Sequence, residues 1–231
     1  MSTREIPGQT PPVEERLAGR LAAGTPPRGA PARTAAVSAL KELGLLDAAV
    51  YRTIAETPTP TLDRPMRKLS DAADRSKLWL GIAAAMAAAG GRTGRRAAAT
   101  GLVAVGLDSA LVNIGFKFAA RRKRPDRDAA GVPADRRVPM PHSASFPSGH
   151  AASAFAFTTA VAQSQPPAAA PLLVLASAVG YSRVHTGVHY PGDVVIGSLI
   201  GATVGRLVGS GLSRLGARPN RPVRRPRQAS A

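Results

Sequence analysis

The sequence contains no cysteine among its 231 residues, which excludes disulfide bonds and zinc sites with cysteine ligands. Aromatic residues make up only 4%, which argues against binding single-stranded nucleic acid by base stacking. Acidic residues are scarce as well: 14 Asp and Glu stand against 31 Lys and Arg, for a formal charge of +17. This imbalance predicts an anionic partner, such as nucleic acid, an anionic lipid or a phosphorylated substrate.

The composition divides the chain into three zones. Residues 1–35 are rich in Pro, Arg, Gly and Glu, lack the apolar core of a secretory signal and are predicted to be a flexible leader. Residues 36–212 hold the apolar segments and are predicted to form the folded domain. Residues 213–231, with six arginines and three prolines, are predicted to be a flexible basic tail, either solvated or held on anionic lipid headgroups.

The apolar segments of the folded zone are of helical type and predict an all-α bundle. A charged and apolar segment, Ala36–Ile54, predicts an amphipathic helix at an interface or against the bundle. Five more apolar segments follow: Leu78–Ala89, Ala97–Phe116, Ala151–Ala162, Ala168–Tyr181 and Val194–Val208. Only Ala97–Phe116 approaches the ~20 residues that a membrane span usually needs.

Glycines recur every four residues in the last segment, at Gly197, Gly201, Gly205 and Gly209. In water, each glycine weakens a helix by about 1 kcal/mol relative to alanine. In a membrane, small residues on one face allow close helix packing. The stripe therefore favours a membrane-embedded bundle over the alternative, a soluble bundle with one tightly packed helix. We expect about five spans in addition to the amphipathic helix.

The first segment with candidate site residues runs from Lys117 to Arg124 and Pro125. The two cations are seven positions apart, which would place both on one face of a helix that Pro125 ends. Two cations on one face suit a phosphate dianion. On its own, the segment is equally well explained as a basic helix end that complements the helix dipole or binds headgroups.

The second segment is Pro147-Ser148-Gly149-His150, directly before an apolar helical segment. Ser148 suits the N-cap, and Gly149 allows the backbone to approach a ligand. The N–H groups at such a helix start attract phosphate, and His150 would lie beside them as a proton donor. The plainer interpretation is a serine cap with a surface histidine.

The third segment runs from Ser182 and Arg183 to His189 and Asp193. A carboxylate four residues after His189 can accept the imidazole Nδ1–H and leave Nε2 free as a nucleophile. Arg183 adds a planar guanidinium suited to phosphate oxygens. The alternative is a helix cap with a structural Arg–Asp pair.

Taken together, the three segments resemble the type 2 phosphatidic acid phosphatase (PAP2) superfamily. Its signature is Lys, six residues and Arg-Pro, then Pro-Ser-Gly-His, then Ser-Arg, five residues, His, three residues and Asp. All eleven defined positions are matched between residues 117 and 193. Asp108 and His185 lie outside these positions and are predicted to be structural.

The resemblance implies a metal-independent phosphatase without a cofactor. His189 would attack phosphorus, Asp193 would orient His189, and His150 would protonate the leaving oxygen and then activate water. The phosphoryl oxygens would be held by the remaining motif residues, Lys117, Arg124, Ser148, Gly149 and Arg183. The substrate class implied is a lipid phosphate monoester or diphosphate, such as phosphatidic acid or a polyprenyl-linked phosphate.

The resemblance leaves two alternatives, a soluble acid phosphatase and a vanadate-dependent haloperoxidase of the same superfamily. A nucleic-acid-binding protein would leave the ordered signature unexplained. We expect a multi-pass protein of the cell membrane, in contact with membrane lipids and a phosphorylated lipid substrate. The arginines at Arg92–Arg96 and in the tail would lie opposite the motifs, so the positive-inside rule predicts an extracytoplasmic active site.

Overall fold

The computed structural model describes residues 32–116 and 122–216, and its description of side chains covers 37–115 and 122–214. Lys117 lies outside the described residues, as do residues 1–31 and 217–231 of the leader and tail. Seven α-helices make up most of the described part: α2 (Ala32–Glu56), α3 (Pro60–Ala72), α4 (Lys77–Ala89), α5 (Gly91–Ala110), α7 (Gly149–Ala162), α8 (Pro166–His185) and α9 (Pro191–Gly216).

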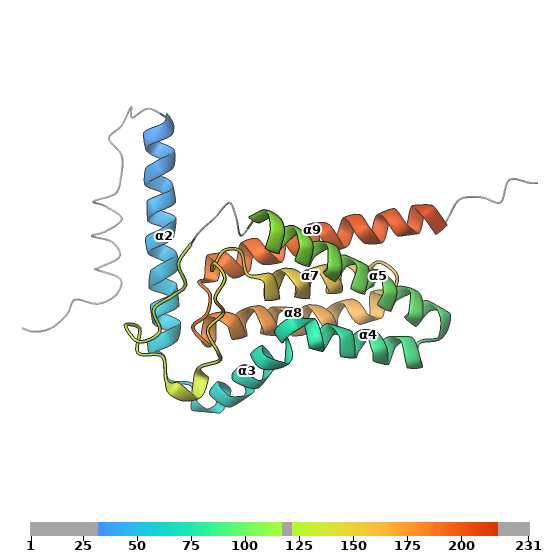
Figure 1. Cartoon of the computed structure of the whole chain (residues 1–231), viewed down its shortest axis with the longest axis horizontal. Helices are drawn as coiled ribbons and strands as arrows, with labels where there is room; N and C mark the ends of the chain where they lie inside the picture. The colour runs from blue at the N-terminus through green and yellow to red at the C-terminus, as the bar shows by residue number, and fades with distance from the viewer. Residues whose placement is uncertain (1–31, 117–121, 217–231) are drawn as a thin grey trace, which may run out of the picture.

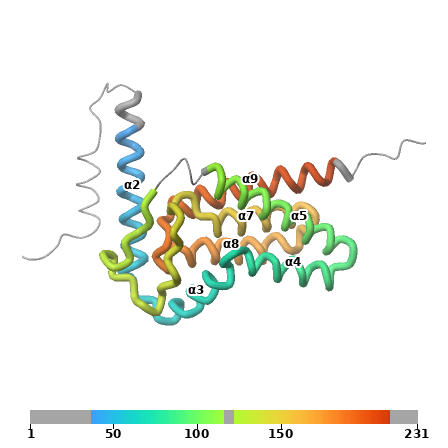
Figure 2. Tube along the Cα trace, viewed as in Figure 1, coloured from blue at the N-terminus to red at the C-terminus, as the bar shows by residue number. Residues whose placement is uncertain are grey.

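Five of these helices, α4, α5, α7, α8 and α9, lie side by side in a bundle (Figure 1). The short helix η1 (Asp74–Ser76) joins α3 to α4, and the π-helical turn η2 (Leu111–Phe116) continues α5. α2 runs across one end of the bundle at a steep angle to the other helices (Figure 1). The tube in Figure 2 shows the segment 122–148, which includes η3 (Ala134–Arg136), passing between α2 and the bundle at this end.

The six predicted helices are all present, and α3 is a further helix that was not predicted. Its two prolines argue against a helix in the sequence, because proline usually breaks one. Pro60 lies in the first turn, where proline is tolerated, and Pro65 lies inside the helix. A second expectation was wrong. Residues 122–126 are not helical, so Arg124 lies on a loop and not on a helix face.

Among the residues that the structure describes, three helical segments are long and apolar enough to cross a membrane: Gly91–Gly115, Pro166–His185 and Pro191–Arg214. The two other bundle helices, α4 and α7, have 13 and 14 residues, which is short for a span. Most of α7 is buried by its neighbours, including Ala152, Ala156 and Phe157. It is therefore apolar as the core of the bundle, where Phe157 lies 5.4 Å from the ring of Trp79.

The glycine stripe of α9 faces α7. A methyl group added at Gly201 would collide with the backbone of Ala152, and one added at Gly205 would collide with the carbonyl of Ala156. At Gly197 the obstacle is the backbone of Ser148, at the start of α7. The predicted close packing is therefore present, and it brings α9 against the segment that carries His150.

This packing makes Gly201 sensitive to a single methyl group. We expect Gly201→Ala to lower the unfolding temperature in detergent by several degrees, because overpacking costs about 1–3 kcal/mol. The control is Gly211→Ala on the same helix, where the added methyl meets no atom within 4 Å. Equal unfolding temperatures for the two variants, followed by circular dichroism, would contradict the close α7–α9 contact.

Candidate active site

His189 lies in the turn between α8 and α9, and Asp193 lies in the first turn of α9. Both side chains are buried, with His189 only 2% exposed. The imidazole Nδ1 is 3.5 Å from Asp193 Oδ2, longer than a hydrogen bond, and it has no hydrogen-bond partner among the described residues. The carboxylate thus lies on the Nδ1 side of the ring, as the four-residue spacing predicted, and Nε2 lies on the side away from it.

The Asp193 carboxylate accepts hydrogen bonds from three donors. Ser145 Oγ donates to Oδ2 at 2.5 Å, and the backbone N–H of Tyr190 donates to the same oxygen at 3.0 Å. Arg122 Nη1 donates to Oδ1 at 2.9 Å. A buried carboxylate is stable only with such partners, and here they also fix its direction relative to His189.

Two guanidinium groups lie close to His189. Arg124 Nη1 is 3.2 Å from His189 Nε2 and donates to the carbonyl of Val188 at 2.7 Å. Arg183 is 3% exposed and donates to Ser70 Oγ at 2.5 Å. Burial lowers the pKa of His189 to about 4, and the two nearby arginines add to this effect while Asp193 opposes it. The imidazole is therefore neutral near pH 7, as a nucleophile requires.

The start of α7 joins this group through the backbone. Ser148 is the N-cap, and its hydroxyl accepts the backbone N–H of Ala151 at 3.4 Å. The N–H of Ser148 donates to the carbonyl of Asp193 at 3.0 Å. The second and third motifs, which are far apart in the sequence, are thus in direct contact, with Gly149 as the first residue of α7.

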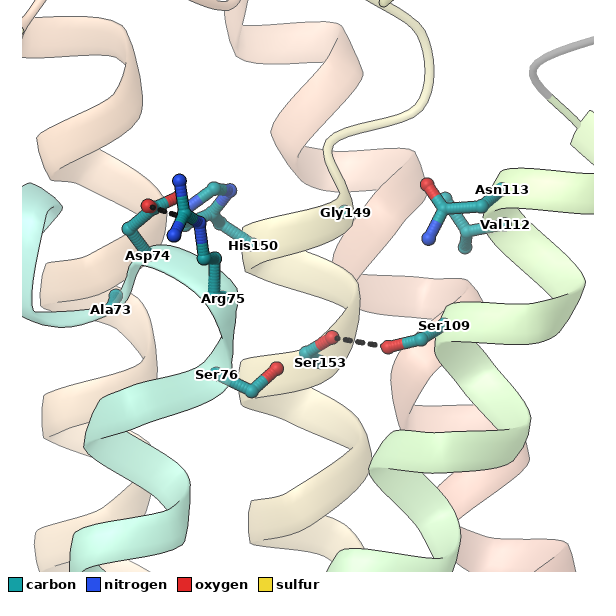
Figure 3. A pocket seen from close by; sticks show the side chains of 10 residues that line it. All are labelled: Ala73, Asp74, Arg75, Ser76, Ser109, Val112, Asn113, Gly149, His150 and Ser153. Carbon is teal, nitrogen blue, oxygen red and sulfur yellow. Dashed lines mark hydrogen bonds and ion pairs between the residues drawn. The ribbon is translucent and has the colours of Figure 1, made fainter. Parts of the chain in front are cut away.

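His150 faces a different environment from His189. Its Nε2 is 3.6 Å from Asp74 Oδ1 on η1, and both residues line a cavity of about 290 Å³ (Figure 3). Arg75, Ser76 and Asn113 line the same cavity. Sequence reasoning found no carboxylate near His150, because Asp74 comes from a separate helix and no spacing rule links the two.

The two residues predicted to be structural are buried among polar partners. Asp108 accepts a hydrogen bond from Ser153 Oγ at 3.4 Å. His185 Nε2 is 3.1 Å from Asp63 Oδ1, and Arg136 Nε donates to the same oxygen at 2.7 Å. This second cluster joins α3 and η3 to the end of α8, and it lies apart from the contacts of His189.

The structure describes every predicted site residue except Lys117. The residues that it describes lie at the end of the bundle that α2 crosses (Figure 1). A model of the PAP2 superfamily matches residues 97–215, about half of the chain. The chain belongs to the PAP2 superfamily. All eleven signature positions fall inside the matched range.

Known PAP2 relatives include decaprenylphosphoryl-5-phosphoribose phosphatases. The Mycobacterium tuberculosis protein is 44% identical over 97 residues, which cover 41% of this chain and 50% of the relative. The Mycolicibacterium smegmatis protein is 39% identical over 131 residues, which cover 57% of this chain and 68% of the relative. The chain thus spans about half the length of the M. tuberculosis relative that it matches.

Two solved PAP2-type structures share the fold. The transmembrane phosphatidylglycerolphosphate phosphatase of Bacillus subtilis has a TM-score of 0.58 at 22% identity, covering 89% of this chain and 96% of that one. LpxE of Aquifex aeolicus has a TM-score of 0.57 at 26% identity, covering 71% and 94%. With three apolar helices of spanning length in its described part, this PAP2 chain is a membrane protein, and the fold of the described residues is all-helical.

The environment of His189 makes its titration testable. We expect its ring to stay neutral from pH 8 to about pH 5 and to titrate near pH 4. Between pH 6.5 and 4, the folded chain then binds fewer protons at this residue than the unfolded chain, so acidification through that range destabilises the fold. Carbon-13 NMR of labelled histidine, assigned with His189→Gln, measures the midpoint. A midpoint near 6.5 would contradict the burial and charge argument.

Proposed function

We propose that this PAP2 protein hydrolyses a phosphorylated lipid through a phosphohistidine on His189, without a metal. The observation that carries the proposal is the arrangement around His189. Its Nδ1 faces a buried, anchored carboxylate, while its Nε2 faces the guanidinium of Arg124. Nε2 is therefore oriented for attack on phosphorus, and the guanidinium of Arg124 beside it can neutralise the charge of the phosphoryl group.

The reaction divides into two displacements. In the first, His189 Nε2 attacks phosphorus, the bond to the leaving oxygen breaks, and His150 gives that oxygen a proton. Asp193 stabilises the positive charge that develops on the imidazole. In the second, His150 accepts a proton from water, the resulting hydroxide attacks phosphorus, and the N–P bond breaks. Inorganic phosphate leaves, and His189 is neutral again.

Phosphoryl transfer depends mainly on positioning and on neutralising the phosphoryl oxygens. We assign that task to Arg124, Arg183 and the N-terminus of α7, where Ser148 offers its hydroxyl group and Gly149 its backbone N–H. Lys117 completes the set on the strength of the sequence motif. Among the residues that the structure describes, no group of three or more His, Asp or Glu side chains is suited to hold a metal ion.

For the substrate, we propose a polyprenyl-linked sugar phosphate. His150 is the proposed donor to the leaving group, so the cavity beside it is where that group would lie. Its lining is largely polar and includes Asp74, Arg75, Ser76 and Asn113 (Figure 3). Hydroxyl groups of a sugar can donate and accept hydrogen bonds there, whereas the diacylglycerol of phosphatidic acid offers mainly ester oxygens, which only accept. The names of the mycobacterial relatives point to the same class of substrate.

We also propose a multi-pass topology with the active site on the extracytoplasmic side. The connection between α4 and α5, which is followed by Arg92, Arg95 and Arg96, lies at the end of the bundle away from α2 (Figure 1). Arginines in short connections favour the cytoplasm. At the opposite end, α2 exposes Leu40, Leu43 and Leu46. These leucines suit a helix lying in the headgroup region of the outer membrane surface.

The substrate assignment predicts a specific order of activities. Purified full-length protein in detergent should release phosphate from decaprenylphosphoryl-5-phosphoribose at least tenfold faster than from phosphatidic acid. EDTA should leave the rate unchanged, and vanadate should inhibit. A rate that falls with EDTA and returns with magnesium would exclude the metal-independent mechanism. Preference for phosphatidic acid would contradict the sugar assignment alone.

The two histidines should differ in rapid-quench labelling with a radiolabelled phosphate ester. His189→Ala should form no phosphoenzyme, because the substitution removes the ring nitrogen that attacks phosphorus. His150→Ala should slow turnover about 10²–10⁴-fold on an alkyl phosphate, and far less in the first step when the leaving group is a nitrophenolate. Asp193→Asn should reduce turnover with little change in binding.

The matched control is His142→Ala, because His142 is exposed and belongs to none of the signature positions. It should label and turn over at the rate of the unsubstituted protein. Labelling that survives His189→Ala and disappears in His150→Ala would show that the two roles are reversed.

A further inference from the structure

Arg122 lies between two carboxylates from opposite ends of the chain. Its Nη1 is 2.9 Å from Asp193 Oδ1, and its Nη2 is 2.7 Å from Asp47 Oδ2 on α2. The guanidinium also covers the ring of Tyr190, with 4.1 Å between Cζ and the ring centroid. Each end of the planar fork thus has its own acceptor, an arrangement that lysine cannot reproduce.

Asp47 holds the start of α9 through its other oxygen as well. The backbone N–H of Gly192 donates to Asp47 Oδ1 at 2.7 Å. Gly192 directly precedes Asp193, and a side chain there would come within 3.0 Å of the Asp47 carboxylate. Asp47 therefore acts on Asp193 by two routes, through Arg122 and through the backbone of the neighbouring residue.

Nearby packing fixes α2 in place. Tyr51, one turn after Asp47, is 3% exposed and meets the ring of Tyr190 edge-on at 5.5 Å. Tyr190 in turn supplies a backbone N–H to Asp193. The helix that crosses the end of the bundle is thus attached to the turn that carries His189.

We propose that Asp47 and Arg122 are positioning residues that hold and charge-balance the catalytic carboxylate Asp193. Neither belongs to the eleven signature positions, and the inference rests on the proposed phosphohistidine mechanism. Arg122 fixes the direction of Asp193 by binding Oδ1, which leaves Oδ2 for the His189 side. An unopposed guanidinium would also weaken the ability of Asp193 to stabilise a positive imidazole. Asp47 offsets that charge.

The charge argument predicts opposite effects of the two single substitutions on the titration of His189. Asp47→Asn leaves Arg122 unopposed beside Asp193 and should move the His189 midpoint down by roughly half a pH unit. Arg122→Gln removes the cation and should move it up by a similar amount. The other charged groups that act on His189, which are Arg124, Arg183 and Asp193, are the same in both variants.

Kinetics supply the second readout. Each single substitution should slow phosphoenzyme formation about tenfold in rapid-quench labelling, with KM for the lipid substrate within about twofold. The double variant Asp47→Asn/Arg122→Gln should be no slower than the slower single variant, because both act through the same contact. Arg122→Lys should recover only part of the rate, because lysine lacks the fork that reaches both carboxylates.

The control is Asp128→Asn, which removes an ion pair of the same kind away from His189. Its exposed carboxylate Oδ1 lies 2.6 Å from Arg137 Nη1. It should leave labelling and the His189 midpoint unchanged. Unfolding temperature in detergent is measured for every variant, and if Asp47→Asn does not fold, Asp47→Ser, which also removes the negative charge, replaces it in both measurements.

The outcomes separate this inference from the function on which it rests. If the unsubstituted protein forms no phosphohistidine, the proposed mechanism fails and the inference falls with it. If the unsubstituted protein labels and Asp47→Asn labels equally fast, only the inference is overturned. Shifts of the His189 midpoint in the same direction in both variants, or rate losses that multiply in the double variant, would show a merely structural role and also overturn it.

Discussion

The structure of this end of the bundle depends on one buried carboxylate. Asp193 is fully buried, and an isolated carboxylate in such a place would be too costly to keep ionised. Its hydrogen-bond donors come from the loop after α5, the segment before α7 and the turn before α9, and the ring of His189 lies beside it. Satisfying this single charge therefore brings together segments that are distant in the sequence. The same contacts define which way the imidazole of His189 faces.

The two histidines of the site are placed in contrasting surroundings. His189 is almost fully enclosed, with two guanidinium groups close by. His150 is partly exposed and lines a polar cavity beside Asp74. A nucleophile benefits from exclusion of water, whereas a group that passes protons to a leaving group and then to water must be reached by both. The position of each residue relative to the bundle core thus matches the part that we propose for it.

Local spacing was enough to predict much of the site. The four-residue interval between His189 and Asp193, the cap at Ser148 and the glycine stripe of α9 each reflect short-range geometry, and the structure shows each of them. Asp47, Asp74, Arg122 and Ser145 could not be found in this way. They approach the histidines or Asp193 from other elements, and a single sequence carries no signal for such tertiary contacts.

Two expectations about local structure were wrong for identifiable reasons. The prolines of α3 made it hard to predict, because proline usually breaks a helix. Here Pro60 lies in the first turn, where proline is tolerated, and Pro65 lies inside the helix. The motif from Lys117 to Arg124 was interpreted as one continuous helix face. Arg124 instead lies on a loop, where it donates to the carbonyls of Ser143 and Val188. Its place beside His189 is set by these backbone acceptors and not by helical periodicity.

The glycine stripe has a mechanical consequence for the site. At Gly197, α9 touches the backbone of Ser148 directly, and the N–H of Ser148 is bonded to the carbonyl of Asp193. Contacts between backbones have no flexible side chain to absorb a displacement. Because α7 and α9 meet backbone to backbone, we expect them to move together when the surrounding bilayer changes thickness or tilts the helices. The distance between the start of α7 and the carboxylate of Asp193 would then change little while the membrane around them changes shape.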